Sequence, residues 1–108
     1  MERELPQEGE IWRHFKGGYY MIICVGHHSE TKEKMVVYAP YGVLEEEQFY
    51  AGCKYTAKTT GYLGEACIRP LEMFMSETDA LKYPEVSQQY RFEKSDMTDE
   101  DFIVGNYH

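Results

Sequence analysis

Three short apolar segments separated by turn-forming residues occupy the first 40 positions, and they limit the fold more than any other feature of the sequence. They cover residues 10–17, 19–26 and 35–40. Gly17 ends the first segment, and Gly18 separates it from the second. Glycine tolerates the positive φ angles of a tight hairpin. The polar residues 26–34 separate the second segment from the third. This spacing predicts a three-stranded antiparallel meander.

The three segments differ in how their side chains alternate. Residues 10–17 place an aromatic ring on each face, Trp12 on one and Phe15 on the other, so alternation does not reveal which face is buried. Residues 19–26 are almost continuously apolar, which is typical of a central strand covered on both faces. We expect the third strand to end at Pro40, because proline has no N–H to donate to a ladder.

Residues 41–66 have a less regular pattern than the segments before them. The glutamates at 45–47 favour the start of a short helical turn, since acidic residues stabilise a helix N-terminus. Residues 53–57 and 61–66 are expected to pair with each other as a hairpin.

Two more short strands are predicted in the rest of the chain. Residues 66–69 form the first, and Pro70 ends its ladder. Met73 and Phe74 then supply apolar side chains to the core, in one helical turn. Residues 89–94 form the last strand.

The end of the chain is acidic and carries helix signals. Thr98 or Ser95 would cap a short helix that Gly105 terminates. The predicted fold class is therefore mainly β: a small barrel or roll built on an antiparallel meander, with short helical turns and an acidic C-terminal segment. The expected organisation is a polar arm (1–8), one domain (9–93) and the acidic segment (94–108).

Composition narrows the classes of function. The chain has 108 residues, enough for one modest core, and a formal net charge of -8. An acidic protein repels a phosphate backbone, so nucleic-acid binding is disfavoured. We expect no membrane span and no signal peptide, because no apolar run has the required length. The three cysteines lack C-x-x-C spacing, which favours reduced thiols in a cytoplasmic protein.

Histidines and a glutamate near the second turn raise the question of a metal site. His14, His27 and His28 are possible nitrogen ligands, and Glu30 is a possible oxygen ligand. Adjacent side chains of a strand point to opposite faces, so His27 and His28 cannot easily share one ion. The spacing of a helical zinc site is also absent. We therefore expect no metal and no cofactor.

The sequence contains no complete set of residues for nucleophilic catalysis. Cys24 lies inside an apolar run, and we expect an inert core thiol rather than a reactive one. Ser29 lacks the flanking glycines of a nucleophile elbow. Ser29 and Thr31 are better explained as loop residues whose hydroxyls bind nearby backbone groups. No catalytic residue is assigned.

Five blocks in a fixed order carry a family resemblance. They are WRHFKGGYY, HHSETKEKMVVY, YG, IRPLEMF and the pair Arg91–Phe92. Together they resemble the small bacterial family catalogued as domain-of-unknown-function family 1653, over residues 9–93. The resemblance implies an SH3-type barrel. It implies no mechanism, since the family has no established activity.

Two features depart from the family pattern. Residues 43–65 form an insertion, and Cys67 stands where the family tends to have a tryptophan. The tyrosines of the insertion would suit either a replacement for that aromatic ring or a homodimer contact. They are Tyr50, Tyr55 and Tyr62.

These observations favour a binding module that recognises a peptide or a small ligand in a groove lined by His, Tyr and Arg. The candidate ligand-binding residues are His14, His28, Glu30, Tyr38, Tyr41 and Arg69. SH3-type barrels commonly expose an aromatic groove of this kind. The alternative is a small enzyme or metal-binding protein that uses His14, His27, His28 and Glu30.

Arg69 is the best-placed cation of the predicted strands. It belongs to a candidate basic patch with Arg13 and Lys16. Its guanidinium could fork onto Glu30, onto Glu72 or onto a ligand anion. We expect one of the internal pairs, because carboxylates are abundant in this chain.

Overall fold

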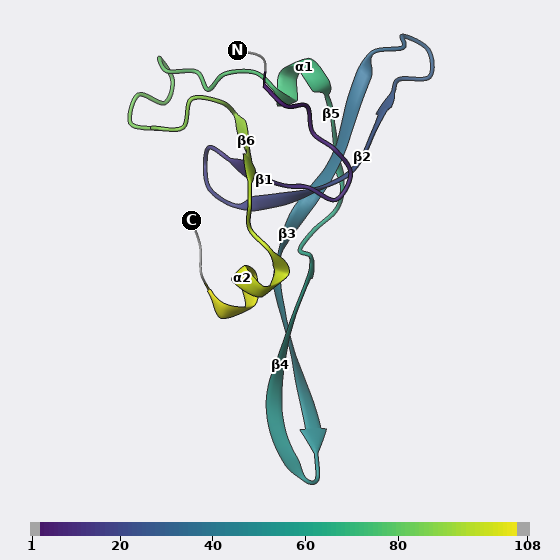
Figure 1. The fold of residues 1–108 in the computed structure, drawn as a ribbon, viewed down its shortest axis with the longest axis vertical. Helices are drawn as coiled ribbons and strands as arrows, with labels where there is room; N and C mark the ends of the chain where they lie inside the picture. The colour runs from purple at the N-terminus through teal and green to yellow at the C-terminus, as the bar shows by residue number, and fades with distance from the viewer. Residues whose placement is uncertain (1–2, 106–108) are drawn as a thin grey trace.

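A computed structural model describes residues 3–105 (Figure 1). Its elements in chain order are β1 (Ile11–His14), β2 (Tyr19–His27), β3 (Lys34–Tyr50), β4 (Cys53–Tyr62), β5 (Cys67–Pro70), α1 (Leu71–Phe74), β6 (Phe92–Ser95) and α2 (Asp99–Val104). The fold is mainly β, as the sequence predicts. Residues 1–2 of the predicted arm and 106–108 of the predicted acidic segment lie outside the described residues.

All strands pair antiparallel in one sheet of order β4-β3-β2-β1-β6, with β5 also paired to β3. The predicted meander of β1, β2 and β3 is confirmed. Among the described residues β5 pairs only with β3, and β6 only with β1. The sheet therefore does not close into a barrel through backbone hydrogen bonds.

The prediction that the third strand ends at Pro40 is wrong, because β3 continues to Tyr50. Along one edge of β3 the partner is β5 as far as Tyr38, and it becomes β4 from Tyr41 onwards. Pro40 lies in the gap between these two partners. Its missing N–H therefore leaves no ladder bond unmade.

The second half of β3 and the whole of β4 form a long hairpin that projects from the rest of the molecule (Figure 1). The predicted helical turn at residues 45–47 and the predicted pairing of 53–57 with 61–66 are both wrong. The two-residue turn at Ala51 and Gly52 has positive φ at both positions, 53° and 80°, which suits a hairpin turn.

Cross-strand pairs explain why these glutamates prefer a strand. Glu45 faces Lys58, and Glu47 faces Thr56. The Nζ of Lys54 lies 3.0 Å from the Oε1 of Glu47. Cross-strand pairs of opposite charge contribute about 0.2–1 kcal/mol each, and they add to a ladder that runs without interruption from Tyr41 to Tyr50.

Two apolar clusters lie on opposite faces of β1. The first contains Trp12, Ile22, Val36, Tyr38, Phe74 and Phe92. The second contains Ile11, Tyr41, Met97 and Phe102. Because successive strand residues point to opposite faces, Ile11 and Trp12 enter different clusters, and this is why alternation alone does not identify a buried face.

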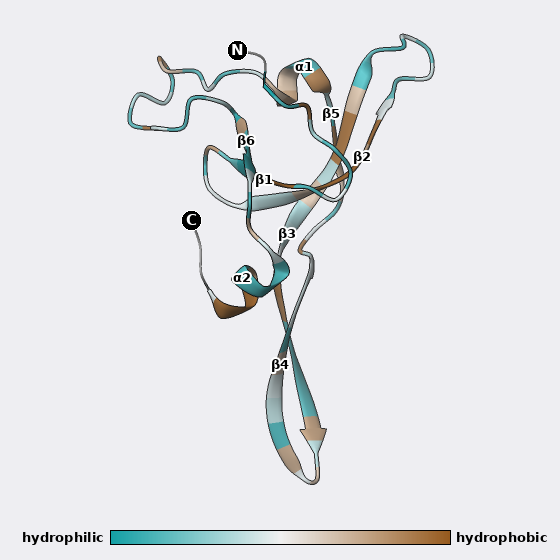
Figure 2. Cartoon of the chain, in the orientation of Figure 1, coloured by the Kyte–Doolittle hydropathy of each residue, from teal (hydrophilic) through white to brown (hydrophobic). Residues whose placement is uncertain are grey.

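The expectation that residues 19–26 are covered on both faces is wrong. Ile22 is the one fully buried side chain of β2, and Cys24 and Val25 are exposed. The outer half of β2 extends beyond the clusters towards a hydrophilic loop (Figure 2). Cys24 is therefore not a core thiol. All three cysteines are free, in agreement with the prediction of unpaired thiols.

A stacked pair of rings joins the two strands that do not hydrogen-bond to each other. Phe74 of α1, which follows β5 directly, stacks on Phe92 of β6 with centroids 4.2 Å apart and an interplanar angle of 8°. Both side chains are fully buried. Met73, predicted in the core, is 49% exposed because a single helical turn presents only one side to the sheet.

The ends of the described chain are held against this core. The guanidinium of Arg3 donates to the carbonyls of Met75 (2.8 Å) and Phe92 (2.6 Å). Of the two capping candidates, Thr98 is the N-cap of α2, and Gly105 ends the helix with φ of 76°. Neither helix is long and apolar enough to cross a membrane within residues 3–105.

We predict that Phe92→Ala lowers the free energy of unfolding by about 3–5 kcal/mol, since it removes a fully buried ring and the stack that ties β6 to α1. Urea denaturation followed by Trp12 fluorescence measures the loss. Leu81→Ala is the control, because Leu81 is 96% exposed and should change stability by less than about 0.5 kcal/mol. Equal effects of the two substitutions would contradict this account.

Candidate functional site

A pocket of about 290 Å³ lies where the β1–β2 turn, β5 and the α1–β6 loop (residues 75–91) meet. We call it the basic pocket. It is lined by His14, Phe15, Lys16, Arg69, Asp79, Lys82, Tyr83 and Arg91. Strand pairing places the first and last of these side by side, since His14 pairs with Phe92, the neighbour of Arg91. The pocket therefore joins segments from both ends of the domain.

The charges in this pocket are unbalanced. Four lysines and arginines face one aspartate, which leaves a net charge of +3 in a chain whose formal net charge is -8. None of the four cations has a carboxylate partner in the part of the chain that the structure describes. Like charges so close together repel one another unless an anion separates them.

The single aspartate of the pocket is occupied elsewhere. The Oδ1 of Asp79 accepts from the backbone N–H groups of Leu81 (3.0 Å) and Lys82 (3.3 Å). Such a bond pattern shapes a turn. Asp79 therefore serves the α1–β6 loop and leaves the cations of the pocket unpaired.

Two guanidinium nitrogens of these cations are buried in the interior of the protein. The Nη1 of Arg69 and the Nε of Arg91 are both buried and have no hydrogen-bond partner within residues 3–105. A buried unsatisfied donor costs about 1–3 kcal/mol, and more when it is charged. The expected internal pair of Arg69 with Glu30 or Glu72 is not formed.

The environment of His14 shows the same excess of positive charge. Burial, followed by the charges of Arg69, Lys16 and Arg91, lowers the pKa of His14 to about 4. Its ring packs edge-on against Phe92 with centroids 4.8 Å apart. At neutral pH the imidazole is therefore uncharged.

Aromatic rings form one wall of the pocket. Phe15 and Tyr83 lie with ring centroids 4.9 Å apart. The ammonium groups of Lys16 and Lys82 lie 5.1 Å and 5.5 Å from the centroid of Tyr83, within cation–π range. Hydrogen bonding to Lys16 is the main cause that lowers the pKa of Tyr83.

Tyr38 lies next to the pocket but belongs to the first apolar cluster. Its ring contacts Phe74 and Phe92, with centroids 5.3 Å and 5.2 Å away. Burial raises the pKa of Tyr38, and the positive charge of Arg69 opposes that change. Of the predicted ligand-binding residues, His14 and Arg69 line the basic pocket, and Tyr38 borders it.

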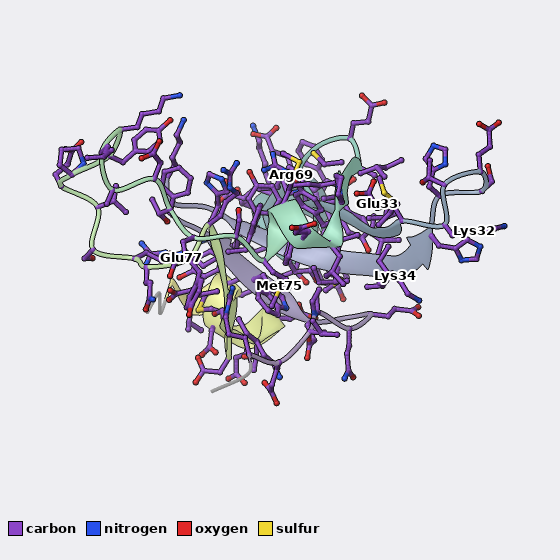
Figure 3. All side chains as sticks on the ribbon, turned by 90° about the horizontal axis from the view of Figure 1, so that it is seen from above. Lys32, Glu33, Lys34, Arg69, Met75 and Glu77 are labelled. Carbon is purple, nitrogen blue, oxygen red and sulfur yellow. The ribbon has the colours of Figure 1, made fainter. Side chains whose placement is uncertain are left out.

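His28 and Glu30 are placed in the β2–β3 loop. The Nδ1 of His28 accepts from the N–H groups of Glu30 (3.2 Å) and Thr31 (3.3 Å), and Thr31 Oγ1 accepts from the N–H of Glu33 (3.2 Å). His28 thus helps to shape the loop. Figure 3 shows Lys32 of this loop at one edge of the molecule, away from the more central Arg69.

Tyr41 belongs to the second apolar cluster. Its hydroxyl donates to the Oδ1 of Asp99 (2.7 Å) and lies 3.0 Å from the Oγ1 of Thr60. Burial raises the pKa of Tyr41. The bond to Asp99 ties the start of α2 to the hairpin and occupies the hydroxyl.

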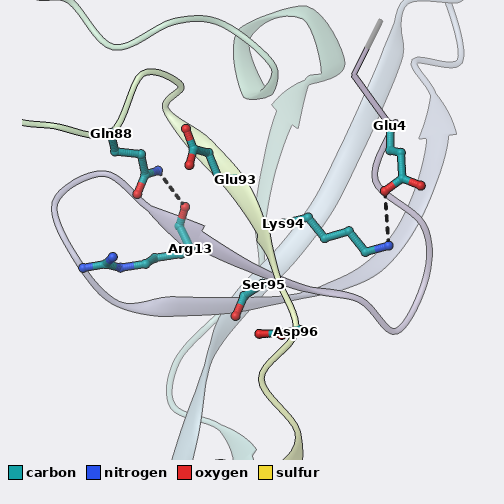
Figure 4. A pocket seen from close by; sticks show the side chains of 7 residues that line it. All are labelled: Glu4, Arg13, Gln88, Glu93, Lys94, Ser95 and Asp96. Atoms are coloured by element: carbon teal, nitrogen blue, oxygen red, sulfur yellow. Dashed lines mark hydrogen bonds and ion pairs between the residues drawn. The ribbon is translucent and has the colours of Figure 1, made fainter. Parts of the chain in front are cut away.

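A larger hollow of about 600 Å³ lies on another face, where Arg13 of the predicted basic patch is found (Figure 4). Its charged side chains are Glu4, Arg13, Glu93, Lys94 and Asp96, whose formal charges sum to -1. The Nζ of Lys94 lies 3.4 Å from the Oε2 of Glu4 and 3.0 Å from the Oε2 of Glu10. The Nε2 of Gln88 donates to the carbonyl of Arg13 (3.1 Å). Unlike the basic pocket, this hollow has no excess of positive charge to offer an anion.

Within the described chain, no group of three His, Cys, Asp or Glu residues is close enough to hold a metal ion. Of the four residues in the alternative metal or enzyme hypothesis, His14 lies in the basic pocket. His27 ends β2, and His28 and Glu30 follow it in the loop.

Sequence reasoning missed the part of the pocket that the α1–β6 loop supplies. Asp79, Lys82 and Tyr83 lie in a stretch with no strand or helix periodicity. Arg91 carried one signal, since it precedes Phe92 in the last block of the family pattern. Only the position of the loop over β5 and β1 brings these residues to His14.

Comparison with known proteins supplies the family. Residues 10–94 match the family model described as "Protein of unknown function (DUF1653)". The chain belongs to this family. The DUF1653 match contains all residues that line the basic pocket. Neither the search of curated proteins nor the search of solved structures found a match.

We predict that Lys16→Gln raises the pKa of His14, because it removes one of the positive charges that oppose protonation. NMR titration of the imidazole measures this. Lys58→Gln is the matched control, since Lys58 lies on the hairpin beside Glu45. An unchanged pKa of His14 in Lys16→Gln would show that the charge of Lys16 does not act on this histidine.

The same shift affects stability. The folded protein binds the His14 proton less readily than the unfolded chain does. The resulting contribution to the free energy of unfolding is present above pH 6.5 and is lost as pH falls towards about 4.

Proposed function

We propose that this member of the DUF1653 family is a binding module that holds the anionic group of a small ligand in the basic pocket. One observation carries the proposal: four lysines and arginines gather there without carboxylate partners, although the chain has 19 acidic residues. Folding brings these charges together at an energetic cost. A bound anion would offset that cost.

The unpartnered guanidinium nitrogens support the same proposal. Arg69 and Arg91 each bury one donor nitrogen without an acceptor. An oxyanion in the pocket would supply acceptors for these donors if the two side chains turned towards it. Hydrogen bonds between guanidinium and an anion are shorter and stronger than neutral ones.

The proposal narrows the predicted groove. It retains His14 and Arg69, with Tyr38 at the border. It leaves out His28 and Glu30, which lie in the β2–β3 loop, and Tyr41, whose hydroxyl binds Asp99 at the start of α2. A volume of about 290 Å³ is at the lower end for ligand pockets, and this favours a small ligand over a peptide.

We also propose that the domain is an open relative of the SH3-type barrel. The strand order β6-β1-β2-β3-β5 supports this assignment, as does the single helical turn before β6. The hairpin of β3 and β4 is then an addition to that arrangement.

Titration of the ¹⁵N-labelled protein with citrate, and separately with inorganic phosphate, tests the proposed function at low ionic strength. We expect amide shifts concentrated at Phe15, Lys16, Lys82, Tyr83 and Arg91. Low salt matters because screening weakens exposed charge pairs.

Arg91→Gln should weaken binding of both anions by about tenfold or more, the expected effect of losing one charged hydrogen bond. Arg13→Gln is the matched control, since Arg13 lies on β1 but outside the basic pocket. Absence of shifts with both anions would reject the proposed function, and so would an equal loss in the two variants.

A further inference from the structure

We propose that the ligand of the basic pocket is a phosphate monoester attached to a planar ring. This inference rests on the proposed function and specifies the class of anion. Three properties of the pocket support it: its charge, the directions from which its cations come, and its aromatic wall.

The charge of the pocket suits a dianion. Lys16, Arg69, Lys82 and Arg91 against Asp79 leave +3, and a phosphate monoester carries about -1.5 to -2 at neutral pH. A single carboxylate would neutralise only one of these charges.

The cations surround the pocket from separate segments. Lys16 comes from the β1–β2 turn, Arg69 from β5, Lys82 from the α1–β6 loop and Arg91 from the residue before β6. A phosphate group presents three terminal oxygens in different directions, whereas a carboxylate presents two in one plane. The tetrahedral group can therefore accept from more of these donors at once, and arginine forks match it well.

The aromatic wall provides a place for the ring. Phe15 and Tyr83 lie together, and Lys16 and Lys82 hold their ammonium groups near Tyr83. A phosphate held by these lysines would bring an attached ring against the same wall. Such a ring pair typically strengthens binding about three- to tenfold. The volume of about 290 Å³ suits one phosphate with a small ring system.

The test compares phenyl phosphate with inorganic phosphate, benzoate and citrate by calorimetry on the full chain. We expect phenyl phosphate to bind roughly three- to tenfold more tightly than inorganic phosphate, which is the contribution of one ring contact. We also expect it to bind at least about tenfold more tightly than benzoate, which has the ring without the dianion. Binding of phenyl phosphate should weaken as pH falls through about 6, where the monoester gains a proton.

Two variants separate the phosphate contacts from the ring contact. Tyr83→Leu should reduce the affinity for phenyl phosphate more than the affinity for inorganic phosphate, so that the ratio of the two affinities falls towards one. Arg91→Gln should weaken both. Tyr90→Leu is the matched control, since Tyr90 packs under Arg3 and does not line the basic pocket. Circular dichroism of each variant confirms that it is folded.

The outcomes distinguish this inference from the proposed function. Citrate or benzoate binding as tightly as phenyl phosphate would overturn the phosphate assignment and leave an anion-binding module. Equal affinities for phenyl phosphate and inorganic phosphate would overturn the proposal that the ligand carries a planar ring. Absence of binding by all four anions would overturn both the inference and the proposed function.

Discussion

The stacked pair of Phe74 and Phe92 is the contact on which the arrangement of this domain depends. Within the described residues β5 and β6 share no backbone hydrogen bonds, so side chains must hold the two ends of the bent sheet together. The stack does this directly, and Trp12 and Tyr38 pack around it. A fully buried aromatic cluster supplies much of the apolar burial available to so small a domain. The arm adds to this closure through the two hydrogen bonds from Arg3.

The basic pocket is a consequence of that closure. Arg69 lies on β5, and its guanidinium carbon is 6.0 Å from the ring centroid of Phe92. Arg91 precedes Phe92, and His14 pairs with it. Packing the rings therefore brings His14 and two guanidinium groups into one place, in spite of the repulsion between the two arginines. The low pKa of His14 reflects both the burial that the rings cause and the charges that come with it.

Local signals predicted the meander and the helix ends well. Glycines with positive φ form the β1–β2 turn, and Thr98 and Gly105 bound α2, because these positions require particular residue types. Predictions failed where the pairing of strands or the position of the core, rather than the local sequence, decides the structure. Pro40 does not end β3, since the missing N–H falls between two neighbouring strands. Residues 45–47 are extended because they lie within the continuous ladder of β3 with β4. Cys24 is exposed because the outer half of β2 extends past the core.

The sequence by itself determined a small acidic domain, mainly β, with an antiparallel meander at its start and membership of a family through five ordered blocks. Hydrophobic periodicity and turn chemistry are local properties, and they are readable without a fold. Only the tertiary structure decided which polar residues meet. His14, Arg69 and Arg91 are far apart in the chain and come together through strand pairing and ring packing, while His28, Glu30 and Tyr41 go elsewhere. The excess of positive charge in one pocket is a property of that packing, and a net charge of -8 conceals it.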